Sequence, residues 1–331
     1  MAGSHARVPV RRRIRLLVWA RRLVQGASLS LFLFLLVQTT FRGTFAAGAE
    51  TPVRLPWPVE AFLLLDPFAA VITLLGTHTL YRGLAWSLLV VALTLILGRA
   101  FCGWLCPFGT LHQLTGWILP PGAPAKARRA EANRTKGWQR GKYYVLWASL
   151  GAALFGSALG GLLDPICVAI RCIGLGVLPA LQYIGVAAAR AVATSNVMAL
   201  QSGSDAAQDA LARSLWTAEQ AHFHQAWLLV GVFVAILFMN RVVPRFWCRA
   251  LCPLGAFLGT LSRFALLGME KAHERCTDCA ACLAHCQGAD SPQGGVQHRQ
   301  EECHLCFNCE AACPEGVIRF RWLPSRRATR V

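Results

Sequence analysis

Long apolar segments separated by short basic ones dominate the chain. The clearest apolar runs cover residues 23–41, 83–98, 143–163 and 226–240. A helix needs about 20 residues to cross the hydrocarbon core of a bilayer, and these runs approach that length. Mean hydropathy is +0.44 and only 15% of residues are charged, which is too apolar for an ordinary soluble domain. The pattern predicts an α-helical integral membrane protein with about four transmembrane helices.

Two further apolar stretches contain an Asp-Pro pair. Residues 59–80 include Asp66-Pro67, and the segment 164–223 starts at Asp164-Pro165 and continues through an apolar run at 173–189. Proline interrupts a helix and a charged aspartate is costly in lipid. We therefore predict a re-entrant or interfacial segment at 59–80, because irregular backbone is tolerated at membrane depth only where protein covers it. Residues 164–223 are expected to lie on the outer side of the membrane.

Clusters of Lys and Arg set the expected topology. They lie at 1–22, at 121–142 and after the last apolar run, and basic loops mark the cytoplasmic side. A cleaved signal peptide is the alternative for the N-terminal segment, since Thr44–Ala49 offers small residues. The apolar stretch before it exceeds the usual length of roughly 7–15 residues, so we expect an uncleaved first helix. The net charge of +17 follows from these flanking segments, and we expect no nucleic-acid partner.

One pattern occurs twice along the chain. Leu65-Asp66-Pro67 is followed by Cys102-x3-Cys106-Pro107, and Leu163-Asp164-Pro165 is followed by Cys248-x3-Cys252-Pro253. Both copies would enter the membrane from the same side, which predicts two parallel repeats. The expected parts are a basic cytoplasmic N-terminus (1–22), repeat 1 (23–120), a basic cytoplasmic loop (121–142), repeat 2 (143–262), a ferredoxin-like domain (263–320) and a basic tail (321–331).

Eight of the fourteen cysteines form two spaced runs near the C-terminus. The spacing Cys-x2-Cys-x2-Cys-x3-Cys is that of bacterial ferredoxins with two [4Fe–4S] clusters, in which the fourth cysteine of each run serves the other cluster. The spacing predicts an α+β ferredoxin-like domain with cluster I on Cys276, Cys279, Cys282 and Cys313, and cluster II on Cys286, Cys303, Cys306 and Cys309. A pair of zinc sites is the alternative, but zinc usually takes two cysteine pairs per site.

The first run departs from the usual pattern at one position. Gln287 follows Cys286 where a proline is usual, and a polar loop at 288–300 separates the runs. The ligand remains, but a rigid turn is lost beside the cluster.

Four cysteines belong to the repeated membrane motifs: Cys102, Cys106, Cys248 and Cys252. If a helix continues through each motif, a spacing of four places both thiols on one face. Convergence of the two pairs would hold a metal or iron–sulfur centre, or run a thiol–disulfide couple. Small residues that pack helices are the alternative, but the repetition favours a function.

Other residues are weaker candidates. Asp66 and Asp164 are candidates for proton handling or, equally, for helix capping. Cys167 and Cys172 are not duplicated, and a disulfide, a redox pair and apolar packing remain open. His112, His222 and His224 are expected to be ordinary. Haem is disfavoured, because no Cys-x-x-Cys-His occurs.

Together these motifs resemble the NapH/MauN/NosR-type membrane-bound 4Fe-4S ferredoxin-like family over about residues 20–320. This family includes the quinol-dehydrogenase membrane component of periplasmic nitrate reductase. The resemblance implies a multi-pass protein of the bacterial inner membrane that passes electrons between the quinone pool, or a cytoplasmic donor, and a periplasmic or membrane redox partner. It also implies a function for Cys102, Cys106, Cys248 and Cys252. A maturation or reactivation factor that supplies electrons to a periplasmic metalloenzyme is the alternative, and a sensor with structural clusters ranks last.

Overall fold

The computed structural model describes residues 12–39, 58–80, 83–120, 125–134, 136–193, 198–214, 225–288 and 300–322. Several sequence expectations fall outside this part of the chain, namely the possible cleavage site at 44–49, His222, His224 and most of the polar loop at 288–300.

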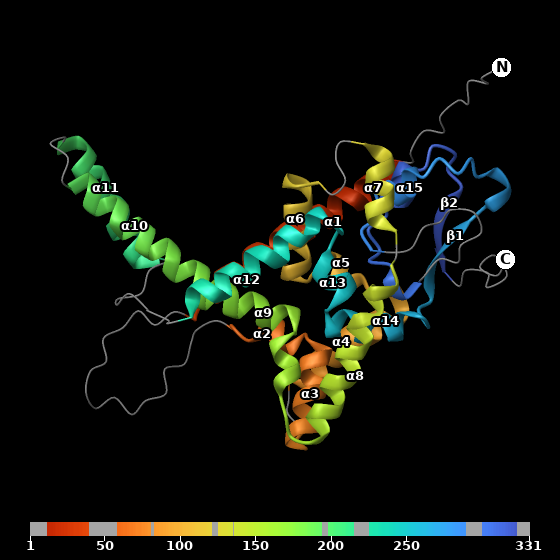
Figure 1. Cartoon of the computed structure of the whole chain (residues 1–331), viewed down its shortest axis with the longest axis horizontal. Helices are drawn as coiled ribbons and strands as arrows, with labels where there is room; N and C mark the ends of the chain where they lie inside the picture. The colour runs from red at the N-terminus through yellow and green to blue at the C-terminus, as the bar shows by residue number, and fades with distance from the viewer. Residues whose placement is uncertain are drawn as a thin grey trace. The chain divides into compact units, whose positions relative to one another are not determined.

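Helices make up most of the described residues (Figure 1). In chain order they are α1 (Arg12–Gln38), α2 (Ala61–Leu64), α3 (Pro67–Thr77), α4 (Leu84–Leu97), α5 (Ala100–Trp104), α6 (Pro107–Ile118), α7 (Lys126–Asn133), α8 (Gly141–Leu154), α9 (Pro165–Cys172), α10 (Leu178–Ala193), α11 (Met198–Ser214), α12 (Ala226–Phe238), α13 (Phe246–Ala250), α14 (Pro253–Ser262), α15 (Ala281–Ala284) and α16 (Asn308–Ala312). Strands β1 (Leu267–Lys271) and β2 (Ile318–Trp322) pair near the C-terminus.

The chain divides into two compact units. The larger contains the described residues of Met1–Leu29, Phe62–Cys167 and Ala235–Val331, and the smaller those of Ser30–Ala61 and Val168–Val234. Within the smaller unit, α10 packs against α11, where Gln208 Nε2 donates to the Gly185 carbonyl at 3.1 Å. The six parts expected from the sequence follow membrane topology and motifs, whereas these two units follow contacts in space. The six-part division therefore stays a prediction.

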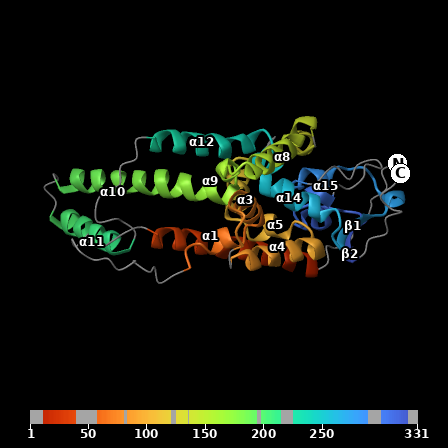
Figure 2. The ribbon, with the colours of Figure 1, turned by 90° about the horizontal axis from the view of Figure 1, so that it is seen from below.

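Four helices, α3, α4, α8 and α14, form the core of the larger unit, and Figure 2 shows it from below. Phe68 of α3 and Leu254 and Leu258 of α14 are fully buried. Burying side chains of this kind contributes roughly 1.5–3 kcal/mol each. The helices thereby fix the short segments that connect them, which carry the repeated motifs.

Both copies of the repeat form the same series of elements. A helix starts after each Asp-Pro (α3 and α9), a short helix carries the first motif cysteine (α5 and α13), and another helix starts after each Cys-Pro (α6 and α14). No single helix runs through either Cys-x3-Cys motif, so the condition for placing both thiols on one helix face is not met. Proline lacks the N–H that a continuing helix needs but suits the first position of a new one, so the chain restarts there.

The Asp-Pro pairs start helices because the aspartates cap them. Asp66 Oδ1 accepts hydrogen bonds from the backbone N–H groups of Phe68 and Ala69 at 2.8 and 3.0 Å. Asp164 Oδ2 does the same for Ile166 and Cys167 at 2.9 and 3.0 Å. The capping role considered for both residues is therefore present.

Two helical stretches of the described chain are long and apolar enough to cross a membrane, Arg12–Gln38 and Pro165–Val192. The first matches the expected first span, and Trp19 and Leu23 on it are exposed. The second lies where the sequence predicted an outer segment. It stays continuous because a π-helical turn at Ile173–Val177 accommodates Gly174 and Gly176. Helix α8 ends at Leu154, short of the expected 163.

A two-stranded antiparallel sheet closes the C-terminal segment. β1 pairs with β2 so that Met269 faces Phe320 across the ladder. Met269, Val317 and Ile318 form a small buried cluster against three cysteines of the two runs, Cys282, Cys309 and Cys313. The sheet thus ties the beginning and the end of the cysteine-rich segment together.

One buried carboxylate joins this segment to both repeats. Glu302 Oε1 accepts from Lys142 Nζ at 2.6 Å, and Glu302 Oε2 lies 3.2 Å from Arg99 Nη1. Burial alone would raise the pKa of Glu302, but Lys142 and Arg99 outweigh it and hold that pKa below its usual value. The carboxylate therefore stays charged between two buried cations.

Glu302→Gln should lower stability strongly, because it leaves Lys142 and Arg99 without their shared counter-charge. Breaking a buried pair in this way costs about 3–5 kcal/mol, or about 10 °C in the thermal midpoint of unfolding. The matched control is Glu301→Gln, whose partner Arg263 is half exposed at 3.7 Å, and such pairs contribute about 0–1 kcal/mol. Equal melting curves for the two variants in detergent would contradict the proposed contribution of Glu302, Lys142 and Arg99 to stability.

Candidate functional site

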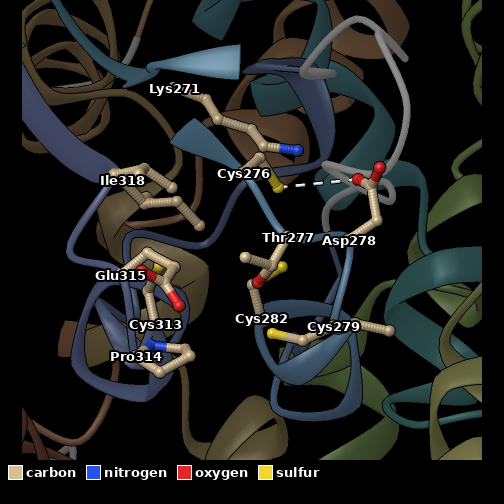
Figure 3. A pocket seen from close by; sticks show the side chains of 12 residues that line it. Lys271, Cys276, Thr277, Asp278, Cys279, Cys282, Cys313, Pro314, Glu315 and Ile318 are labelled. Carbon is tan, nitrogen blue, oxygen red and sulfur yellow. Dashed lines mark hydrogen bonds between the residues drawn. The ribbon is translucent and has the colours of Figure 1, made fainter. Parts of the chain in front are cut away.

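The structure gathers the four cysteines expected for cluster I. Cys276, Cys279, Cys282 and Cys313 line one pocket, together with Lys271 (Figure 3). Cys276, Cys279 and Cys282 come from one loop, and Cys313 comes from the far end of the second run. The crossing of one cysteine between the runs agrees with the spacing argument.

The second set lies beside the first. Cys309 interacts electrostatically most strongly with Cys306, Cys286 and Cys303, ahead of Cys282 of the other set. Cys303 is buried with Leu305 and Phe307, and Cys286 packs against this group. The partition into two interleaved sets therefore fits the geometry.

The two cysteine loops have the same backbone conformation. Asp278 and Ala280 flank Cys279 with φ of 48° and 52°, and Leu305 and Phe307 flank Cys306 with φ of 48° and 56°. Such left-handed conformations cost non-glycine residues roughly 1–2 kcal/mol. These positions could not be predicted from the sequence, because none of the four is the glycine that usually marks one.

The donor set suits a cluster better than a single ion. Within the described residues, no three His, Cys, Asp or Glu side chains are close enough together to hold one metal ion. A single zinc ion binds thiolates at about 2.3 Å, which draws its ligands into contact. Thiols spread around a pocket, as in Figure 3, fit the separate corners of a larger cluster.

The first membrane motif touches the second cysteine loop directly. A Cβ on Gly103 would lie only 2.0 Å from the His304 carbonyl oxygen. Trp104 Nε1 donates to the Leu305 carbonyl at 3.1 Å, and its ring meets that of Phe307 edge to face. Burial and the surrounding cations keep the pKa of His304 well below its usual value, so its imidazole is neutral.

The four membrane cysteines lie close to one another and are all buried. Cys106 is near Cys102 and Cys248, and Cys252 is near Cys248 and Cys102. Cys106 and Cys252 occupy the N-cap positions of α6 and α14. The convergence that the repeat suggested is thus present, although it does not arise from one continuous helix face.

Asp66 and Asp164 face each other and are fully buried. Each uses one carboxyl oxygen as a helix cap, and the other oxygen, Asp66 Oδ2 or Asp164 Oδ1, is buried without a hydrogen-bond partner within the described residues. Two neighbouring carboxyl groups in a buried place disfavour the ionisation of both. Capping and proton handling are therefore compatible roles.

The remaining candidates have ordinary surroundings. No disulfide joins cysteines in the described part of the chain, and the alternatives considered for Cys167 and Cys172 stay open. His112 Nδ1 lies 2.9 Å from Asn240 Oδ1, and its ring packs on Phe108. His112 therefore has a structural explanation.

A family model described as a 4Fe-4S binding domain matches residues 79–124 and 223–268. These two segments carry the membrane motifs, and each contains only two cysteines.

Three curated relatives illustrate the similarity. The chain is 26% identical to the regulatory protein NosR of Pseudomonas aeruginosa over 74% of its own length and 30% of that protein's. For the putative electron transport protein YccM of Escherichia coli the values are 27%, 81% and 64%. For the methylamine utilization ferredoxin-type protein MauN of Methylorubrum extorquens they are 26%, 80% and 73%. The chain thus spans under a third of NosR and under two thirds of YccM. No solved structure matches the chain.

Exchanging single ligands should reveal how the eight C-terminal cysteines are shared. In Cys286→Ala, the cluster on the second loop should be lost, so Cys303, Cys306 and Cys309 should react with an alkylating reagent under anaerobic conditions. In Cys313→Ala, the reactive set should instead be Cys276, Cys279 and Cys282. Mass spectrometry of tryptic peptides measures both patterns, and protection that follows each run as a unit would contradict the crossing.

Gly103→Ala should disturb the contact between the first membrane motif and the second cysteine loop. The new Cβ meets backbone of His304, which cannot rotate away, so the loop must shift. We expect faster alkylation of Cys303 and a lower thermal midpoint. Gly116→Ala is the control, because nothing lies within 4 Å of a Cβ there. If both variants had the same alkylation rate of Cys303 and the same thermal midpoint, the contact would contribute nothing to stability or to the protection of Cys303.

Proposed function

Because this chain is a distant homologue of NosR, NapH, MauN and YccM, ferredoxin-type proteins with 4Fe-4S binding domains, we propose that it transfers electrons between a membrane quinol and a redox partner protein. The homology supports ferredoxin-type electron transport. The quinol, the partner and the direction of transfer are the proposal.

An apolar pocket beside the second cysteine loop carries the proposal. Its volume is about 350 Å³, within the range of pockets that hold small ligands. It lies between α1, α4, α5 and the C-terminal segment, and its lining contains no charged side chain. A charged carrier such as a nucleotide would leave its charges unpaired there, whereas an apolar ring with an isoprenoid tail would not.

The outer part of the pocket continues into the apolar surface of two helices. Leu17 and Val24 of α1 and Leu93 of α4 line it and are partly exposed. Helix α1 is one of the two candidate spans. A ligand dissolved in the bilayer could therefore enter from the side without crossing water.

The inner part of the pocket reaches the predicted cluster II ligands. Leu305 and Phe307 line it, and Cys306 stands between them in the chain. Trp104 closes the same end while its Nε1 is held by the Leu305 carbonyl. These residues exclude water from the space next to the thiol. When bound, [4Fe–4S] clusters supply one-electron chemistry.

Quinol oxidation releases protons as well as electrons. Asp66 and Asp164 are neighbours in a buried place, and we assign them this task. The proposal includes the expected setting, namely a bacterial inner membrane, about four spanning helices in two parallel repeats, re-entrant Asp-Pro segments and a cytoplasmic ferredoxin-like domain. A role in maturing or reactivating a periplasmic metalloenzyme stays a prediction, because no contact among the described residues favours it.

Filling the pocket should weaken binding of a quinol analogue. Leu93→Trp places a large side chain in the pocket and should raise the dissociation constant of a fluorescent hydroxyquinoline quinol analogue by roughly tenfold, or 1.4 kcal/mol. Leu95→Trp is matched, since Leu95 has nearly the same exposure, 38% against 40%, and does not line the pocket.

Fluorescence titration of the full chain in nanodiscs measures both variants, with iron content as a check on integrity. Weak binding to both variants or to neither would place the ligand elsewhere. If quinol failed to change the EPR spectrum of the wild-type protein, the proposed function itself would be wrong.

A further inference from the structure

Buried positive charge surrounds the four membrane cysteines. Arg99, Arg245 and Lys142 are at most 2% exposed and act electrostatically on Cys248. Among the described residues, one carboxylate forms ion pairs with this group. It is Glu302, which pairs with both Arg99 and Lys142. Asp66 and Asp164 lie nearby, and full ionisation of two neighbouring carboxyl groups is disfavoured in a buried place. Helix N-termini add further positive potential, so the site has a surplus of positive charge.

The arginine that precedes each motif contacts the motif of the other repeat. Arg99 stands three residues before Cys102, but it reaches the second motif, where a Cβ on Gly255 would lie 2.8 Å from Arg99 Nη2 and 3.2 Å from Cys252 Sγ. Arg245 stands three residues before Cys248, but its Nη1 donates to the Cys102 carbonyl at 3.1 Å. The reciprocal contacts make one centre from both copies.

Two of the sulfurs lie where a negative charge is favoured. Cys106 and Cys252 lie at the N-terminal ends of α6 and α14, which carry the positive end of the helix dipole. The Gly255 N–H donates to Cys252 Sγ at 3.1 Å, whereas Cys106 occupies the corresponding N-cap position without a side-chain cap hydrogen bond. One copy thus directs a backbone donor at sulfur, and both place a sulfur at a helix N-terminus.

Several arginine donors at this centre lack an acceptor. Within the described residues, Arg99 Nε and Nη2 and Arg245 Nε are buried without a hydrogen-bond partner. Leaving charged donors unsatisfied in this way is costly. Neutral thiols are weak acceptors and carry no charge, so packing alone does not account for the arrangement.

We propose that Cys102, Cys106, Cys248 and Cys252 together hold one iron–sulfur cluster, additional to the two of the C-terminal runs, with Arg99 and Arg245 as its counter-ions. Four thiolates around an oxidised core leave a net charge of about −2, which the two arginines match. The match of both segments to a 4Fe-4S binding domain supports this proposal. Each segment has only two cysteines, so four cysteine ligands require both segments. As at the C-terminal thiols, the described residues offer no site for a single ion.

Metal analysis of anaerobically purified wild-type protein tests the proposal without any activity. We expect iron and acid-labile sulfide clearly above the roughly eight per chain that two cubanes supply. Eight irons, or zinc in place of the excess, would overturn the proposal.

Variants locate the additional iron. Cys248→Ala should lose only the excess, whereas Cys167→Ala, a cysteine outside the two motifs, should keep it. An excess that survives Cys248→Ala would contradict the assignment. Arg245→Gln retains all the thiols and should make the midpoint potential of one centre more negative while leaving two unchanged, because a cation stabilises the reduced form. Three unchanged potentials would remove Arg245 as a counter-ion. None of these results depends on quinol binding, so the two proposals can fail separately.

Discussion

Helix capping by a residue that precedes a proline is the constraint on which the larger unit depends. Asp66, Cys106, Asp164 and Cys252 each end an irregular segment and precede the helix that begins at the next residue, and all but Cys106 cap it with a side-chain hydrogen bond. Because proline fixes the first helical residue and has no N–H to satisfy, each helix starts at a defined point. The four starts lie near one another, and this brings two carboxyl groups and two thiols into one buried region.

Local features of the sequence predicted a large part of this arrangement. The repeated Asp-Pro and Cys-x3-Cys-Pro patterns indicated two similar halves, and the spacing of the C-terminal cysteines indicated two interleaved sets. Features that depend on tertiary contacts could not be predicted in this way. The reach of Arg99 to the second motif joins residues more than 150 positions apart, and the left-handed residues around Cys279 and Cys306 have side chains that usually avoid that conformation. The helix at Pro165–Val192 was not predicted as a span, because the Asp-Pro pair and the apolar run at 173–189 were assigned to a segment on the outer side.

Similar as they are, the two copies have different neighbours. The first motif contacts the second cysteine loop through Gly103 and Trp104. The second motif lies against the basic segment, where Arg249 Nη2 donates to the Asn133 carbonyl at 3.0 Å and Phe246 meets Trp138. A symmetric centre is thus embedded in an asymmetric surrounding, and a carrier with one input and one output needs such a difference between its two sides.

Arg99 and Arg245 each contact the motif of the opposite repeat. Reciprocal contacts, in which each half gives the other the same residue, are the mark of an isologous dimer interface. A chain with a single copy of the pattern could build the same centre by associating with an identical chain. Joining the halves in one polypeptide removes the dependence on concentration, and it frees each half to acquire a neighbour of its own.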